Sequence, residues 1–188
     1  MDEFETVRSL VVNRLSGLAS NLTYHCLDHT LDVLKQSERI AADEQVHSRR
    51  DLYLLKVAAL YHDTGFLETY AAHEMKSCEI FLSDAEHFDF TTDEKSVITN
   101  LIMATQIPQR PETLLEKIIC DADLDYLGRD DFFSIGDNLR KEFLQYQIVS
   151  DDEQWEQLQI KFLQSHQYHT DSSRRLREPY KQLNFAAL

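Results

Sequence analysis

An all-α fold is predicted by two features of the sequence, the scarcity of turn-forming residues and the spacing of the apolar side chains. The 188 residues include only 4 glycines and 3 prolines, which leaves few turns and no room for a many-stranded sheet. Apolar residues recur three and four positions apart, the period of amphipathic helices. A chain of this length most simply forms one domain. We therefore expect a single helical domain over residues 1–188, with about seven to nine helices.

The expected helices begin at capping residues, whose side-chain oxygens can accept the first free N–H groups of a helix. Thr23 and Thr92 are the expected N-caps of two helices, and Ser48 or Asp51 opens another. That third helix is expected to stop at Gly65, because glycine is favoured just past a helix end. Besides this third helix, the expected helices cover residues 4–18, 24–42, 68–82, 92–105, 112–126, 131–149, 152–167 and 173–188.

Three segments place histidine and aspartate in apolar helical surroundings. They read YHCLDH over 24–29, HD at 62–63 after the apolar run 52–61, and CDADLD over 120–125. Imidazole nitrogens and carboxylate oxygens together suit a divalent transition metal such as Mn, Fe, Co, Ni or Zn. His25 and His29 are four residues apart and so share one helix face, which by spacing alone would allow both to chelate the ion.

The order H…HD…D resembles the signature of the HD superfamily of metal-dependent phosphohydrolases. The resemblance covers residues 20–130, with the C-terminal helices of the domain following over 131–188. It implies a helical HD domain and one divalent metal ion. The four positions of the signature fall on His29, His62, Asp63 and Asp123.

The stretch YHCLDHTLDV also resembles the helix of cyclic-nucleotide phosphodiesterases that reads Y-H-N-x-x-H-A-x-D-V. This resemblance makes His25 a general acid and His29 a metal ligand. Cys26 replaces the asparagine of that pattern, and the chain is shorter than a phosphodiesterase catalytic domain. The small, stand-alone HD proteins are therefore the closer relatives that we expect.

Two choices among the acidic and histidine residues remain to be tested. The segment over 120–125 offers three carboxylates, of which the family pattern A-D-x-L selects Asp123, with Asp121 as the alternative. Asp63 is expected to accept the proton of the attacking water or to bridge to a second ion. A second ion would need further histidines, and the range 92–105 has none, which leaves His73. We therefore expect one metal ion.

Cations near these segments are candidates for binding a substrate phosphate. The best placed are Lys76, Arg110 and Arg129. The expected function is hydrolysis of a small phosphate ester, a nucleotide or cyclic nucleotide above all; the alternative is a non-catalytic signalling module that binds metal or nucleotide. The sequence after His62-Asp63 departs from the H-D-T-x-E-D pattern of alarmone hydrolases, which argues against that substrate.

The net charge and the cysteine spacing indicate which binding partners and which cellular compartment to expect. A formal charge of −14 and a pI near 4.9 argue against nucleic acid as a partner. The three cysteines are isolated, as in a reduced cytoplasmic protein, and the acidic N-terminus carries no targeting core. No apolar run reaches the ~20 residues that span a membrane. The oligomeric state is left open, a homodimer included.

Overall fold

The structure confirms the all-α fold. A computed structural model describes residues 3–188, and over that range it contains nine α-helices, three short 3-10 helices (η) and no strand. No helix in the described range is long and apolar enough to cross a membrane. The elements are α1 Glu3–Leu15, α2 Leu27–Asp43, α3 Arg49–Tyr61, η1 Thr64–Leu67, α4 His73–Asp84, η2 Ala85–His87, α5 Thr92–Ala104, α6 Leu114–Asp123, η3 Asp125–Gly128, α7 Phe132–Gln145, α8 Asp152–Ser165 and α9 Asp171–Ala186.

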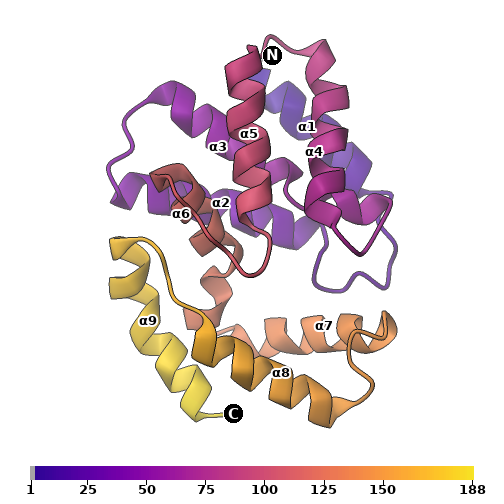
Figure 1. The fold of residues 1–188 in the computed structure, drawn as a ribbon, viewed down its shortest axis with the longest axis vertical. Coiled ribbons are helices and arrows are strands. Elements are labelled where there is room, and N and C mark those ends of the chain that lie inside the picture. Colours follow the sequence, from indigo (N-terminus) through magenta and orange to yellow (C-terminus); the bar gives the residue numbers. More distant parts are fainter. Residues whose placement is uncertain (1–2) are drawn as a thin grey trace.

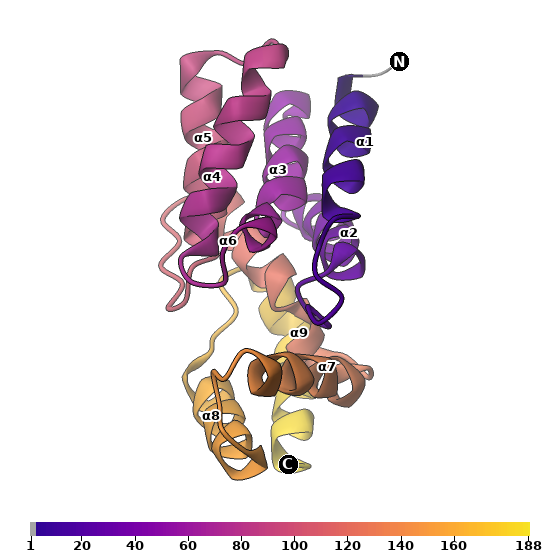
Figure 2. The ribbon, with the colours of Figure 1, turned by 90° about the vertical axis from the view of Figure 1, so that its right-hand side faces the viewer.

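The helices form an upper bundle and a lower group. Figure 1 shows α1 to α6 in the upper part of the molecule and α7 to α9 in the lower part. Figure 2, turned by 90°, shows α7 and α8 crossing below the bundle. Within the bundle α2 packs against both α3 and α6, and in the lower group α9 packs against η3. The three segments that carry the histidines and aspartates are therefore neighbours in space.

The main core encloses α3. Val7, Leu55, Ile98 and Ile118, from four different helices, are 0% exposed and belong to one apolar cluster. Every side chain over residues 57–60 is also 0% exposed, so α3 is surrounded on all sides, as a helix with apolar residues all round must be. Close packing of this kind fixes the position of the residues that follow the helix.

The start of α2 differs from the prediction. Thr23 was the expected N-cap, but the N-cap residue is Cys26, and the Thr23 hydroxyl donates instead to the backbone carbonyl of Asn138, at 2.7 Å. The predicted cap is wrong because a contact with α7, distant in sequence, engages the threonine side chain. Two other helices are capped by residues close to the predicted ones. Ser48 caps α3 as expected, and α5 is capped by Thr91, one residue before the predicted Thr92.

Gly65 has a packing role instead of the predicted role as a helix stop. No glycine in residues 3–188 has a positive φ, so the left-handed stop does not occur. A Cβ at Gly65 would lie 2.0 Å from the carbonyl oxygen of His73, so only glycine permits this approach of η1 to α4. The Ser77 hydroxyl accepts from the Gly65 N–H at 2.8 Å and donates to the His62 carbonyl at 2.7 Å. The segment after α3 is thus fastened to α4.

Candidate metal centre

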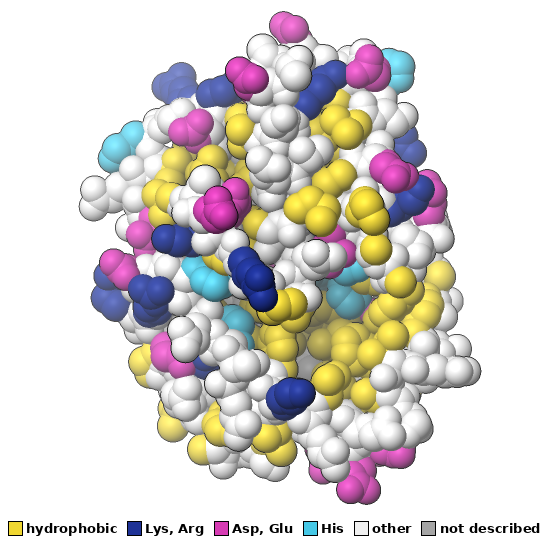
Figure 3. Space-filling view, viewed as in Figure 1, with side chains coloured by type: hydrophobic (Ala, Val, Ile, Leu, Met, Phe, Trp, Pro, Cys, Tyr) yellow, Lys and Arg dark blue, Asp and Glu magenta, His cyan; other side chains and the backbone are white. Residues whose placement is uncertain are grey.

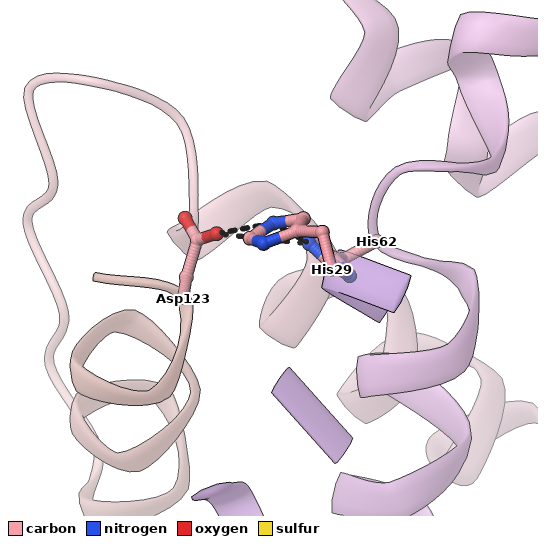
Figure 4. Close-up of side chains that lie close together, drawn as sticks. All are labelled: His29, His62 and Asp123. Atoms are coloured by element: carbon pink, nitrogen blue, oxygen red, sulfur yellow. Dashed lines mark hydrogen bonds and ion pairs between the residues drawn. The ribbon is translucent and has the colours of Figure 1, made fainter. Parts of the chain in front are cut away.

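The predicted metal ligands meet where three helices begin or end. His29 lies in the first turn of α2, and Asp123 is the last residue of α6. His62 follows the last residue of α3, and Asp63 comes next. Figure 4 shows His29, His62 and Asp123 pointing toward one another from these separate segments.

The nitrogen and oxygen atoms of this group are spaced like the ligands of a single ion. The Nε2 atoms of His29 and His62 are 3.4 Å apart. The Asp63 Oδ2 atom lies 3.3 Å and 3.2 Å from these two nitrogens, and the Asp123 Oδ1 atom lies 3.2 Å and 3.7 Å from them. Ligands ~2.1 Å from a shared ion lie roughly 3.0–3.4 Å from one another in tetrahedral or octahedral geometry. His29, His62 and Asp123 can therefore hold one divalent ion, and Asp63 lies beside both histidines.

A backbone hydrogen bond places a hydrogen on the Nδ1 atom of His62. Its Nδ1 atom lies 2.8 Å from the carbonyl oxygen of Ala59, and a carbonyl only accepts, so Nδ1 carries the hydrogen. In neutral imidazole the other nitrogen then has a free lone pair, and Nε2 directs it at His29 and the carboxylates. Metal-binding histidines are commonly oriented by such a bond from the second ring nitrogen.

The Asp63 carboxylate also fits a bound cation. Its Oδ2 atom is buried and accepts no hydrogen bond from the described residues, although it lies at ion-pair distance from both imidazoles. A buried carboxylate oxygen without a hydrogen bond is costly. A cation between Asp63 and the two histidines would satisfy it.

The electrostatics of the group favour a positive charge at its centre. Burial alone would lower the pKa of His29, but the nearby carboxylates of Asp123 and Asp63 outweigh it and raise the pKa from 6.5 to about 9. Burial alone would raise the pKa of Asp123, but hydrogen bonds with His29 and His62 bring it down to about 2. Two buried carboxylates thus stabilise positive charge between them, whether a proton or a divalent ion supplies it.

His25 lies beside this group and outside α2. Since α2 begins at Leu27, the prediction that His25 and His29 share a helix face is wrong, and their ring centroids are 6.0 Å apart. The His25 ring stacks on Phe66 at 4.2 Å, and its Nδ1 atom contacts the carboxylate of Glu142. With Nδ1 engaged, Nε2 is the nitrogen left to meet a substrate.

Glu142, which holds His25, was not found from the sequence. It is 0% exposed on α7, and it accepts hydrogen bonds from the backbone N–H groups of Tyr24 and His25 and from the Tyr70 hydroxyl. Burial would raise its pKa, but the hydrogen bond and charge of His25 outweigh burial and lower the pKa below its ordinary value. Glu142 is 117 residues from His25, and nothing around it in the sequence marks it as buried.

His73 extends the cluster on the side of Asp63. Its Nε2 atom is 3.4 Å from Asp63 Oδ1 and 3.6 Å from Glu74 Oε1, and its ring stacks on Phe66 at 4.0 Å. Phe66 therefore contacts both imidazoles, whose ring centroids are 5.9 Å apart. One histidine and one glutamate are few ligands for a second ion, so the expectation of a single ion stays a prediction.

The alternative carboxylate, Asp121, faces another part of the chain. It accepts hydrogen bonds from the backbone N–H of His169 and from the N–H and hydroxyl of Thr170, at 2.6–2.8 Å. Asp125 is likewise engaged, by the guanidinium groups of Arg39 and Arg177. Asp121 and Asp125 thus hold α9 and the segment before it against the end of α6. Of the three aspartates, only Asp123 lies beside His29 and His62.

The three predicted phosphate-binding cations have different surroundings. Lys76 pairs with Glu68 and Glu79 on the exposed side of α4. Arg129 forms ion pairs with Asp32, Asp125 and Asp131. Arg110 is exposed, between α5 and α6. Their role in substrate binding stays a prediction.

Two cavities meet at the metal centre. One, of about 290 Å³, is lined by His25, Asp63, His73 and Asp123 and continues between α7 and α8. The other, of about 280 Å³, lies on the side of His29 and Asp123 and is lined by polar residues that include Arg129. The candidate ligands can therefore be approached from two sides, and His25 lines only the first cavity.

Comparisons with known proteins give one result that bears on the site. The model of the HD domain family matches residues 26–125, which is more than half of the chain and includes all four candidate ligands. Neither the curated proteins nor the solved structures include a match.

Proposed function

The chain belongs to the HD domain family, and from this we propose that it is a metal-dependent hydrolase of a small phosphate ester, a nucleotide or cyclic nucleotide above all. Members of this family are generally metal-dependent phosphohydrolases. The observation that carries the proposal is the convergence of ligand atoms from His29, His62 and Asp123, which all lie within 4.8 Å of one another. The Asp63 carboxylate lies beside both imidazoles.

In this proposal His29, His62, Asp63 and Asp123 hold one ion of Mn, Fe, Co, Ni or Zn. Such an ion, when bound, polarises a phosphoryl oxygen and lowers the pKa of a water molecule, so that hydroxide is available near neutral pH. Asp63, which also lies near His73, orients the attacking water and accepts its proton.

His25 supplies the other proton transfer. It lines the same cavity as Asp63, and an imidazole is suited to donating a proton near neutral pH. Its Nε2 protonates the oxygen of the departing group as the phosphorus–oxygen bond breaks. Glu142 holds the ring by Nδ1 and stabilises its positive charge before the transfer.

The alternative is a signalling module that binds a metal ion or nucleotide without turnover. One observation favours it: two of the three expected phosphate-binding cations are already paired with carboxylates. Turnover of any phosphate ester that depends on both the metal and His25 would exclude this alternative.

The proposal is tested by measuring metal content and hydrolysis together. We expect purified protein to contain about one equivalent of transition metal, and His62→Ala and Asp123→Asn to lose most of it, because removing one of four ligands severely weakens a site. Metal is measured by plasma mass spectrometry, and hydrolysis with a panel of nucleotides, cyclic nucleotides and nitrophenyl phosphates.

The matched control is His47→Ala, which removes an exposed histidine that lines neither cavity at the metal centre. It should keep both metal and activity. Full metal occupancy in His62→Ala and Asp123→Asn would contradict the assignment of the ligands, while metal binding without hydrolysis of any substrate would favour the signalling module.

A further inference from the structure

The cavity beside His25 opens into a space with apolar walls. We call this space the apolar chamber and define it by six lining residues: Leu127, Leu139, Phe143, Trp155, Leu158 and Phe162. They come from η3, α7 and α8. On the face drawn in Figure 3, hydrophobic side chains border a hollow above α8, with a histidine at its edge. The chamber is thus continuous with the metal centre.

The charges around this cavity are those of a site for a single phosphate. Among residues 3–188, no lysine or arginine lines it, and its acidic members are Asp63, Glu74 and Asp123. One divalent ion leaves little positive charge to offset these three carboxylates and one phosphate group, and each further phosphate would add uncompensated negative charge. The other polar groups of the lining, among them Gln159, are uncharged.

From these walls and charges we infer that the substrate carries one phosphate on an uncharged, largely apolar organic group, which occupies the apolar chamber while the phosphate lies at the metal centre. This inference rests on the proposed function and narrows its substrate class. A cavity of about 290 Å³ is at the lower limit for drug-sized ligands, so the organic group is small. A flat aromatic base and a short hydrocarbon chain share the required chemistry.

The protein carries a natural probe of the chamber, because Trp155 is its only tryptophan. Non-hydrolysable ligands separate binding from turnover: methylphosphonate, hexylphosphonate and phenylphosphonate are titrated into the metal-loaded protein, with tryptophan emission and calorimetry as readouts. We expect Kd to fall about 10- to 100-fold from the methyl to the hexyl compound, since each buried methylene favours binding. The emission of Trp155 should change with the hexyl and phenyl compounds and not with the methyl compound.

Two residues of α8 give a matched pair of variants. Leu158 lines the chamber and is 39% exposed, whereas Ile160 is 38% exposed and does not line it. Leu158→Asn should raise the Kd of hexylphosphonate about tenfold, the effect of losing one apolar contact, and leave methylphosphonate unchanged. Ile160→Asn should change neither. Both positions are partly exposed, so neither substitution should unfold the protein.

The outcomes divide clearly. Tighter binding of the phenyl compound assigns a flat aromatic group, tighter binding of the hexyl compound assigns a hydrocarbon chain, and either supports the inference. Equal Kd values for the methyl, hexyl and phenyl compounds would overturn it, as would equal effects of Leu158→Asn and Ile160→Asn. So would ATP binding more tightly than hexylphosphonate and depending on Arg129, because the substrate would then lie in the second cavity.

Failure of the inference and failure of the proposed function look different. If the function holds and the inference fails, metal-dependent hydrolysis is seen without any preference for apolar groups. If the inference holds and the function fails, the phosphonates bind in the expected order and no ester is hydrolysed.

Discussion

His25 and Glu142 are the residues whose individual roles are easiest to separate from metal binding. His25 lies outside the group of four ligand atoms, and its contact with a carboxylate on α7 sets the direction of its ring. Hydrogen-bonded partners of functional histidines typically contribute 10- to 100-fold to activity, which makes the carboxylate as testable as the imidazole.

We expect His25→Ala to retain its metal and to lose about 10²–10⁴-fold in hydrolysis rate, the usual range for a positioned proton donor. Glu142→Gln should also retain the metal and lose about 10–100-fold. Both losses should shrink for nitrophenyl esters, whose leaving group hardly needs a proton, and this dependence is measured across esters of increasing leaving-group pKa. Loss of metal from His25→Ala would instead make His25 a ligand, and an equal loss for every leaving group would mean that Glu142 is merely structural.

At the scale of single residues the sequence predicted which candidate ligands would lie together better than it predicted the residues around them. His29, His62 and Asp63 stand in a recognisable order along the chain, and the structure brings them together with Asp123. Glu142 belongs to no such order, because its role arises only when α7 folds back over the start of α2. A buried contact between distant segments leaves no local signal.

Among the helices, α8 and α9 are joined by a buried histidine and a buried lysine. The Lys181 ammonium donates to the carbonyl of His166 at 2.7 Å and lies 3.3 Å from its Nδ1 atom. Burial and the neighbouring positive charge of Lys181 lower the pKa of His166 from 6.5 to about 3. His166 is therefore neutral in the folded protein over the whole range in which an unfolded histidine becomes charged.

This pKa shift predicts a loss of stability in mild acid. Below pH 6.5 the unfolded chain binds a proton at His166 that the folded chain does not bind until the pH approaches 3, so the free energy of unfolding falls as the pH drops through that window. The contribution at pH 5 is about 2 kcal/mol. Urea unfolding at pH 7 and pH 5 should therefore show a smaller acid-induced loss in His166→Leu than in the wild type. In His87→Leu, which changes an exposed histidine, the loss should be unchanged, and an unchanged loss in His166→Leu would contradict the assignment.

Helical periodicity predicted each of the nine α-helices, but their first residues were harder to place. The side chains that cap α3 and α5 lie next to the helices that they cap, and those starts were predicted to within a residue or two. The start of α2 was not, because Thr23 donates to α7. The role of Gly65 was also hidden, since the reason for a glycine there is the nearby backbone of α4.

For the molecule as a whole, a metal ion at this centre would join α2, α3 and α6. We expect the ion to stabilise the folded state by about 4 kcal/mol when its free concentration is a thousand times Kd. Since 1 kcal/mol shifts Tm by about 2–4 °C in a protein of this size, removing the ion with a chelator should lower Tm by roughly 8–16 °C. Scanning calorimetry with and without the chelator measures this, and Asp123→Asn should show no such difference. Identical melting curves for the two wild-type samples would mean that the native protein carries no ion.

The link between Asp125 and α9 has a consequence for the order of events during synthesis. Residues 26–125 leave the ribosome before Arg177, which is one of the two arginines that donate to the Asp125 carboxylate. Until Arg177 emerges, the Asp125 carboxylate lacks one of its charge partners. The segment η3, which follows Asp123 at the end of α6, also lacks its contacts with α9. In a nascent chain that lacks α9 the position of Asp123 should therefore be less firmly held, and we expect the ion to bind only after α9 has docked.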